Sequence, residues 1–129
     1  YLGLFETAIN QDEIVIGIKY PLLKQEQAIL FDEVCRRHGD YAMAGLIANV
    51  NKTGSKVNDL SLVYFATGDK PDSADKTAKL YLENGYDYSN LKNSLNSEID
   101  FAGDLNSSSE MKLHLATILI KKVLNKLEA

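Results

Sequence analysis

The chain has 129 residues, of which 45% are hydrophobic and 25% charged, and these proportions are typical of a single soluble globular domain spanning residues 1–129. The formal net charge of −4 provides no basic surface for nucleic acid. Charged residues or glycines interrupt every apolar run before it reaches the length of roughly 18 residues that a membrane span needs. The single cysteine, Cys35, cannot form an internal disulfide and suits a reducing compartment, so we expect a cytoplasmic protein.

The start of the chain indicates a fragment. Its first residue is Tyr1 rather than an initiator methionine, and no charged stretch followed by an apolar core marks a secretory signal. We therefore expect that the chain is a piece of a longer protein.

Alternating apolar residues predict strands in the first half of the chain. In Glu13–Tyr20, three isoleucines and a tyrosine recur at every second position, and Pro21 ends the segment because proline has no amide donor. Ala28–Arg37 alternates less regularly and favours an extended segment, although a short helix is also compatible with it. The residues of this segment that we expect to face the core are Ile29, Phe31 and Cys35.

Two further strands form a predicted hairpin. Tyr41–Val50 places small and apolar residues on one side, and Leu60–Ala66 is rich in Val, Tyr and Phe. Asn51–Asp59, which contains Gly54 and Ser55, is the predicted turn between them. The residues on the first side of the earlier strand are Ala42, Ala44, Leu46, Ala48 and Val50.

The second half of the chain predicts helices. The first helix follows the start signal Lys70-Pro71-Asp72 and ends at Gly85. The second helix runs over Ser89–Ile99, with Ser89 as its N-cap. The residues at helical spacing in these two segments are Ala74, Thr77, Ala78, Tyr81, Leu82, Leu91, Leu95 and Ile99.

The last helix has the clearest sequence signals. Ser107 and Glu110 have the spacing of a capping box, in which each side chain satisfies an unpaired backbone donor. The expected buried stripe consists of Met111, Leu115, Ile118, Leu119 and Leu124. Because the strands precede the helices, we predict an α+β fold: an antiparallel sheet of three to four strands followed by three helices packed on one face.

Few residues stand in catalytic arrangements. A glycine-rich dinucleotide turn, a phosphate-binding loop, paired CxxC motifs and HExxH are absent from the sequence. His38 and His114 are far apart in the sequence; we interpret His114 as structural or solvent-facing, and Cys35 as a small buried hydrophobe. We therefore expect no catalytic residue and no metal site, and we expect that the chain cannot hold a dinucleotide tightly by itself.

Charges of both signs gather between two apolar runs in Phe31–Tyr41. Neighbouring arginines on an extended chain point to opposite faces, so Arg36 or Arg37 should approach the core or another domain. Arginine pairs well with carboxylate or phosphate, and Asp32 and Asp40 are nearby partners. A solvated turn with local ion pairs is the alternative interpretation of the same residues.

Four segments in order resemble one known family. Arg36–Gly45, with the sequence RRHGDYAMAG, is similar to the RRxGDYAxAG stretch of carbon monoxide dehydrogenase flavoprotein (medium) subunits and of related xanthine dehydrogenase-like molybdenum hydroxylases. Glu13–Pro21, Leu62–Pro71 and Ser108–Ala116 resemble the EIV…P strand, the segment that leads into the helices, and the closing helix of that family. Together the four segments span nearly the whole chain.

The resemblance implies a C-terminal domain whose N-terminal FAD-binding region is missing from this chain. Such a domain would support the flavin site and subunit assembly in an enzyme that passes electrons from molybdenum and iron–sulfur subunits to FAD. FAD would belong to the full-length subunit and would not be retained by this fragment, which would not be catalytic alone. The implied partners are the N-terminal FAD-binding domain of the same subunit and the molybdopterin-binding and 2Fe-2S subunits.

The resemblance also suggests site residues. The segment around Arg36, Arg37 and Asp40 would lie nearest the flavin or at the interdomain contact. In xanthine-dehydrogenase-like relatives a lysine four residues before the first arginine approaches the FAD, whereas this sequence has Asp32 at that position. A free-standing, non-catalytic protein-interaction module is the alternative function.

Overall fold

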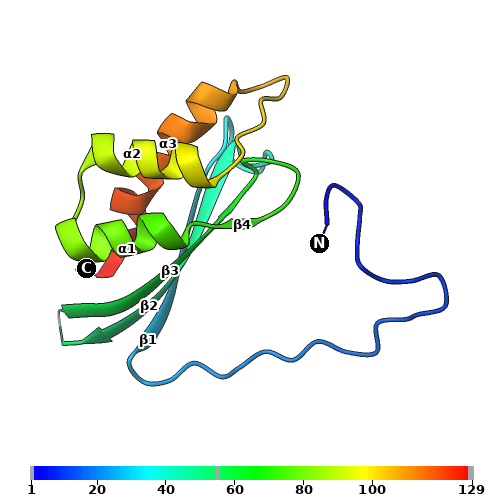
Figure 1. Ribbon diagram of the computed structural model, residues 1–129, viewed down its shortest axis with the longest axis horizontal. Helices are drawn as coiled ribbons and strands as arrows, with labels where there is room; N and C mark the ends of the chain where they lie inside the picture. The colour runs from blue at the N-terminus through cyan, green and yellow to red at the C-terminus, as the bar shows by residue number, and fades with distance from the viewer. Residues whose placement is uncertain (1, 55, 128–129) are drawn as a thin grey trace.

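The computed structural model describes residues 2–54 and 56–127 and shows one antiparallel sheet followed by helices (Figure 1). The strands are Gln27–Val34 (β1), Ala44–Thr53 (β2), Lys56–Phe65 (β3) and Asp72–Ser73 (β4), and they pair in the order β1-β2-β3-β4. The helices are Asp75–Asn84 (α1), Tyr88–Glu98 (α2) and Ser109–Leu124 (α3), with a short 3-10 turn at Asn125–Leu127 (η1). The predicted α+β fold is confirmed.

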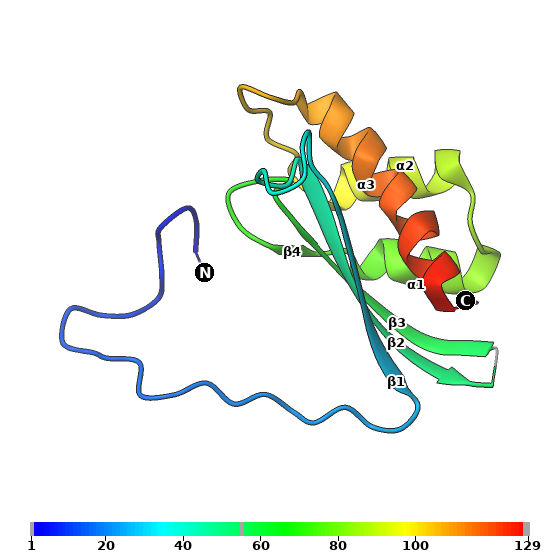
Figure 2. The same ribbon diagram turned by 180° about the vertical axis from the view of Figure 1, so that it is seen from behind.

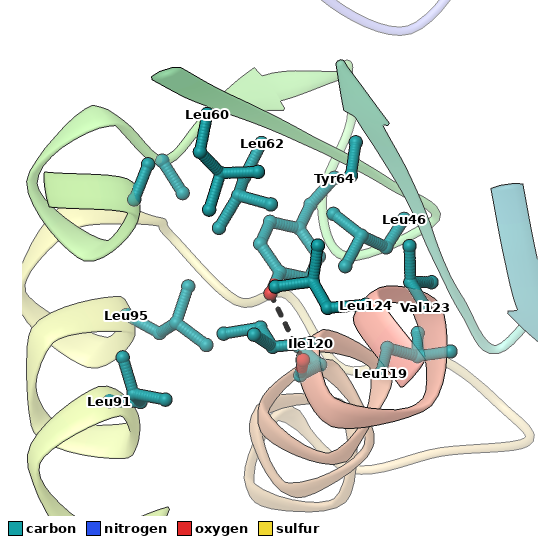
Figure 3. Close-up of a cluster of buried hydrophobic side chains, with 14 of the residues drawn as sticks. Leu46, Leu60, Leu62, Tyr64, Leu91, Leu95, Leu119, Ile120, Val123 and Leu124 are labelled. Atoms are coloured by element: carbon teal, nitrogen blue, oxygen red, sulfur yellow. Dashed lines mark hydrogen bonds between the residues drawn. The ribbon is translucent and has the colours of Figure 1, made fainter. Parts of the chain in front are cut away.

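The core lies between the helices and one face of the sheet. In β2 the predicted inward face is confirmed, because Ala44, Leu46, Ala48 and Val50 are buried. The matching face of β3 contributes Leu60, Leu62 and Tyr64, as Figure 3 shows. Further large buried side chains come from α2 and α3, among them Leu91, Leu95, Leu119, Ile120, Val123 and Leu124.

Tyr64 is a fully buried aromatic residue in this core. Its hydroxyl donates a 3.0 Å hydrogen bond to the Ala116 carbonyl of α3, so the polar end of the ring is satisfied (Figure 3). Burial, followed by the nearby charge of Glu98, raises the pKa of the Tyr64 hydroxyl well above its ordinary value. The hydroxyl therefore keeps the proton that it donates to the helix.

The predicted hairpin forms, with a shorter turn than expected. β2 continues to Thr53 and β3 begins at Lys56, so most of the predicted turn is strand. Gly54 adopts a positive φ of 61°, which glycine tolerates, and Ser55 lies outside the described residues.

The predicted inward face of β1 is wrong. Ile29 and Phe31 are 55% and 51% exposed, whereas Leu30 and Val34 pack against the core. The register explains the difference, since Leu30 pairs with the buried Ala48 of β2 and both must face the helices. Cys35 is partly buried just after the strand, and the extended alternative for this segment is the correct one.

The predicted strand Glu13–Tyr20 is also wrong. Residues 7–26 contain no strand, and Ile14, Ile16 and Ile18 are 84%, 97% and 70% exposed. An alternating pattern becomes a strand only where a neighbouring strand supplies hydrogen bonds, and no part of the described chain does so. Figures 1 and 2 show residues 2–26 as an extended segment on the side of the sheet opposite the helices, and its first residues, Leu2 and Gly3, line a hollow together with residues of the loop after β3.

The structure shifts two predicted helix caps by one or two residues. The Asp87 side chain, not Ser89, caps α2 by accepting a 3.0 Å hydrogen bond from the Asn90 amide. Ser108, not Ser107, caps α3 by accepting from the Met111 amide at 3.2 Å. Three consecutive serines offer equivalent caps in the sequence, and the path of the preceding turn selects one of them.

The buried side of α3 differs from the predicted stripe. Leu119 and Leu124 are buried as expected, but Met111 and Ile118 are 46% and 39% exposed. The buried residues of α3 are Lys112, Leu113, Ala116, Thr117, Leu119, Ile120, Val123 and Leu124. Apolar residues occur on more than one side of this helix, so its sequence alone does not identify the side that meets the sheet.

An aromatic side chain covers a glycine on the outer face of the sheet. The rings of Phe31 and Phe65 stack with their centroids 5.8 Å apart. Phe65 pairs with Gly45 across the β2–β3 ladder, and a Cβ at Gly45 would lie 2.0 Å from the tip of the Phe65 ring. Only a glycine leaves room for the ring in this position.

We predict that Gly45→Ala destabilises the fold by about 1–2 kcal/mol, because the Phe65 ring must leave its position and its stacking contact. Urea unfolding followed by circular dichroism measures the change. Gly17→Ala is the control, since a Cβ at Gly17 meets no atom within 4 Å. Equal stability of Gly45→Ala and the unmodified chain would contradict this prediction.

Candidate functional site

The loop between β1 and β2, residues 35–43, carries the three predicted site residues. The Met43 amide donates to the Val34 carbonyl at 2.7 Å and closes the base of the loop. The Asp40 amide donates to the Arg37 carbonyl at 3.1 Å, and Gly39 takes a positive φ of 91° inside this turn. The turn leaves Arg36, Arg37 and Asp40 exposed.

The structure brings two of these residues into one cavity of about 170 Å³, which we call the loop site. Its lining residues are Arg36, Asp40, Tyr41, Ala42, Met43, Asp104 and Asn106. Arg37 belongs to the same turn but does not line the cavity. The loop site is therefore formed by two segments that lie about sixty residues apart in the chain.

Sequence reasoning missed Asp104 and Asn106, which come from the turn before α3. The Asp104 side chain accepts hydrogen bonds from the amides of Asn106 and Ser107 at 2.7 and 2.9 Å. Asp and Asn two residues apart, directly before a run of serines, are a recognisable turn signal. That signal predicts the turn, but not its contact with the loop at residues 35–43.

Tyr41 is the second residue that the sequence analysis did not select. Its side chain is 99% exposed at the edge of the loop site. An aromatic ring on the surface beside an arginine can stack on a planar ligand while its hydroxyl stays in water. Tyr41 therefore adds an apolar surface to an otherwise polar site.

The expected local ion pairs of the arginines do not form. Among the described residues, neither Arg36 nor Arg37 forms a salt bridge with Asp32 or Asp40. Both guanidinium groups therefore keep their hydrogen-bonding capacity for a ligand or another protein surface.

Asp32 is directed away from the loop site and towards α3. Its carboxylate, 14% exposed, pairs with Lys122 at 3.0 Å and with Lys126 at 2.9 Å. Lys126 also donates to the Phe31 carbonyl. Desolvation raises the pKa of Asp32, but hydrogen bonds from Lys126, Lys122 and the Glu33 amide outweigh this effect and leave the pKa below its ordinary value. Asp32 thus fastens β1 to the end of α3.

The other candidate residues do not form a reactive group. The Tyr88 hydroxyl and His114 Nδ1 lie 2.6 Å apart, in an edge-to-face ring contact between α2 and α3. Within the described residues, no cluster of His, Cys, Asp or Glu is suited to a metal ion, and no helix is long and apolar enough to cross a membrane. The contact between Tyr88 and His114 joins the two helices.

A larger hollow of about 380 Å³ lies between α2 and the start of α3. Its charged lining residues are Lys92, Asp100 and Glu110, and Phe101 and Leu113 belong to its apolar part. None of the residues of the RRHGDYAMAG stretch lines it. The loop site therefore remains the candidate that joins the sequence motif to a cavity.

The chain matches a known family and several known proteins. The sequence model described as "CO dehydrogenase flavoprotein C-terminal domain" matches residues 29–127. The glyceraldehyde dehydrogenase medium chain of Sulfolobus acidocaldarius is 34% identical over 71 residues, which are 55% of this chain and 25% of the relative. The carbon monoxide dehydrogenase medium chain of Hydrogenophaga pseudoflava is 26% identical over 62 residues, which are 48% of this chain and 22% of the relative. The matches thus span about a quarter of the curated relatives.

Solved structures share the fold. CO dehydrogenase from Oligotropha carboxidovorans superposes with a TM-score of 0.84 at 19% identity, covering 99% of this chain and 46% of that chain. Quinoline 2-oxidoreductase from Pseudomonas putida 86 superposes with a TM-score of 0.63 at 21% identity, covering 79% of this chain and 36% of that chain. At these identities the similarity concerns the fold.

We predict that Asp32→Asn lowers the free energy of unfolding at pH 7 by about 0.5–1 kcal/mol, since both lysine partners are half-exposed and screened. The folded-state pKa of Asp32 is lowered, so its contribution is present above the unfolded pKa of about 3.9 and disappears as the pH falls through the folded pKa. The stabilities of variant and unmodified chain should therefore converge at acidic pH.

Urea unfolding between pH 7 and pH 3 tests this expectation. Asp12→Asn is the control, because Asp12 is exposed and forms no salt bridge in the part of the chain that the structure describes. A stability difference for Asp32→Asn that is the same at every pH would argue against the two ion pairs as its cause.

Proposed function

Because the chain belongs to the family of CO dehydrogenase flavoprotein C-terminal domains, we propose that it supports the flavin site in the FAD-binding medium subunit of a molybdenum hydroxylase. The observation that carries the proposal is the loop site. There the family-like stretch Arg36–Gly45 presents an exposed arginine and an exposed tyrosine around a cavity. In this role the chain, residues 1–129, is one domain of a longer subunit and is not catalytic alone.

The residues of the loop site fit an edge of a flavin cofactor. Arg36 and Arg37 can donate hydrogen bonds to phosphate or carbonyl oxygens, and Asp40 can accept from a ring N–H. The Tyr41 ring can cover one face of a planar ring system. When bound, FAD supplies the electron-accepting chemistry, whereas these side chains hold and orient the cofactor.

The same residues do not fit a complete FAD. A cavity of about 170 Å³ is smaller than the roughly 300–1,000 Å³ of typical small-molecule sites. The sequence also lacks a glycine-rich turn for the phosphates. Most contacts to FAD would therefore come from the N-terminal FAD-binding region of the same subunit, and the isolated chain would not retain the cofactor.

Two exposed apolar surfaces support contact with that N-terminal region. One is the segment at residues 2–26, whose exposed side chains include Phe5, Ile14, Ile16, Tyr20 and Leu22. The other is the outer face of the sheet, where Ile29 and Phe31 are more than half exposed. Both lie on the side of the sheet away from the helices (Figures 1 and 2), so one protein body can cover them together.

Further partners belong to the same proposal. The molybdopterin-binding and 2Fe-2S subunits would bind the assembled flavoprotein subunit and deliver electrons to its FAD. The cytoplasm is the proposed location, because the single thiol of Cys35 suits a reducing compartment.

We predict that the double variant Arg36→Ala, Arg37→Ala lowers the flavin content of the longer subunit, because two donors to the cofactor or its domain are lost. The loss of about 1–1.5 kcal/mol for each of the two hydrogen bonds corresponds to a roughly 30-fold to 150-fold weaker affinity for FAD. Absorbance of the purified subunit measures the bound flavin, and titration with FAD measures the affinity.

Lys79→Ala is the control for this double variant, since Lys79 is a surface residue of α1 with a side chain that is 78% exposed. A longer subunit that purifies without flavin and does not bind added FAD would refute the proposed function. Unchanged flavin affinity in the double variant would show that Arg36 and Arg37 do not contribute to binding of the cofactor.

We also predict that the N-terminal FAD-binding region of the longer subunit protects residues 14–18 of this chain from hydrogen exchange. We expect this because that region would supply the strand partner that the segment lacks here. The amides of Ile14, Ile16 and Ile18 should exchange rapidly in the isolated chain and at least about tenfold more slowly in the longer subunit. Exchange followed by mass spectrometry compares the two proteins. Equal exchange in both would contradict the proposed interface.

A further inference from the structure

Lys112 is a buried cation at the start of α3. Only 5% of this residue is exposed, although lysine is rarely buried without a partner. Its ammonium group lies 2.8 Å from Asp104 Oδ2 and donates a 2.9 Å hydrogen bond to the Ala66 carbonyl. Lys112 therefore joins the turn before α3 to the end of β3.

Both partners of Lys112 stand at irregular backbone. Ala66 adopts a positive φ of 59°, a conformation that a residue with a Cβ rarely takes. Asp104 organises the turn before α3, because its Oδ1 accepts from the amides of Asn106 and Ser107 and its own amide donates to the Ser107 carbonyl at 2.8 Å. Lys112 forms a charge-assisted hydrogen bond to each of these two residues and so fixes the position of both irregular segments relative to α3.

The turn that Lys112 holds forms one wall of the loop site. Asp104 and Asn106 line the cavity together with Arg36, Asp40 and Tyr41. One carboxylate oxygen of Asp104 binds Lys112, while the other receives the two turn amides, so the carboxylate has a defined orientation. The hydrogen bond from Lys112 is the main cause that lowers the pKa of Asp104.

We propose that Lys112 is a positioning residue for the flavin-proximal site, and that the turn at residues 104–107 is the second wall with which this domain contacts the cofactor. The proposal rests on the proposed function of the loop site. Lys112 acts from inside the domain without touching the ligand, through Asp104 and the turn amides. Asn106, whose side chain amide can donate and accept, is the contact residue of this wall.

Hydrogen exchange of the 129-residue chain tests the positioning role without any cofactor. In Lys112→Met the amides of Asn106 and Ser107 should exchange about tenfold faster, since their acceptor loses its charged anchor. Lys112→Arg keeps the charge and the donors and should restore exchange to within about twofold of the unmodified chain. Lys79→Met, which removes an exposed lysine, is the matched control and should leave both amides unchanged.

Asp104→Asn serves as a second variant if Lys112→Met does not fold. The Asp104 side chain is 45% exposed, so this substitution does not disturb the core. It keeps an acceptor for the turn amides but loses the charge that binds Lys112, and exchange should rise about threefold. Unchanged exchange of Asn106 and Ser107 in the variants of Lys112 and Asp104 would overturn the proposal.

FAD titration of the longer subunit tests the second wall. Lys112→Met and Asn106→Ala should each weaken FAD binding about fivefold, while Lys112→Arg should bind like the unmodified subunit. If the arginine variants weaken binding but Lys112→Met and Asn106→Ala do not, the second wall is refuted and the proposed function stands. If none of these variants alters FAD binding, the proposed function fails, and with it the second wall.

Discussion

The position of α3 on the sheet is the constraint on which the rest of this domain depends. Ala44 and Ala48 are small enough for close packing over β2, and Tyr64 bonds the Ala116 carbonyl of the helix. Once the helix lies there, lysines near its two ends reach different parts of the sheet. Lys112 binds the end of β3 and the turn before α3, whereas Lys122 and Lys126 bind Asp32 of β1.

The geometry of the loop site depends on these two sets of lysine contacts between α3 and the sheet. One wall follows β1, which the Asp32 ion pairs fasten to the helix, and the other is the turn organised by Asp104. Arg36 and Tyr41 can therefore lie exposed on a short loop without a side-chain ion pair to the rest of the described residues, because the ends of that loop are fixed. Exposed polar groups on a loop with a rigid base are the usual arrangement of a binding surface on a folded scaffold.

Local patterns in the sequence predicted the parts of the fold that depend on local physics. The alternation in Tyr41–Val50 and Leu60–Ala66 identified the central hairpin, and the helical spacing of Leu91, Leu95 and Ile99 identified the buried side of α2. The sequence patterns predicted the wrong inward face for β1 and only part of the buried side of α3, and they did not predict the partners of Asp32. Each of these features is decided by residues far away in the chain. Glu13–Tyr20 has the pattern of a strand but no partner in the described residues, and the contact between the loop and Asn106 has no local signal.

The start of α1 has a consequence for how the domain unfolds. Ala74 provides no side-chain cap, and Glu98, at the end of α2, accepts hydrogen bonds from the amides of Lys76 and Thr77 at 2.7 and 3.1 Å. Each helix therefore satisfies hydrogen-bonding groups of the other. Without α2 the first amides of α1 would lack an acceptor, and without α1 the Glu98 carboxylate would lack these donors. Loss of either helix therefore exposes polar groups that the other one had satisfied, which couples the start of α1 to the end of α2 during unfolding.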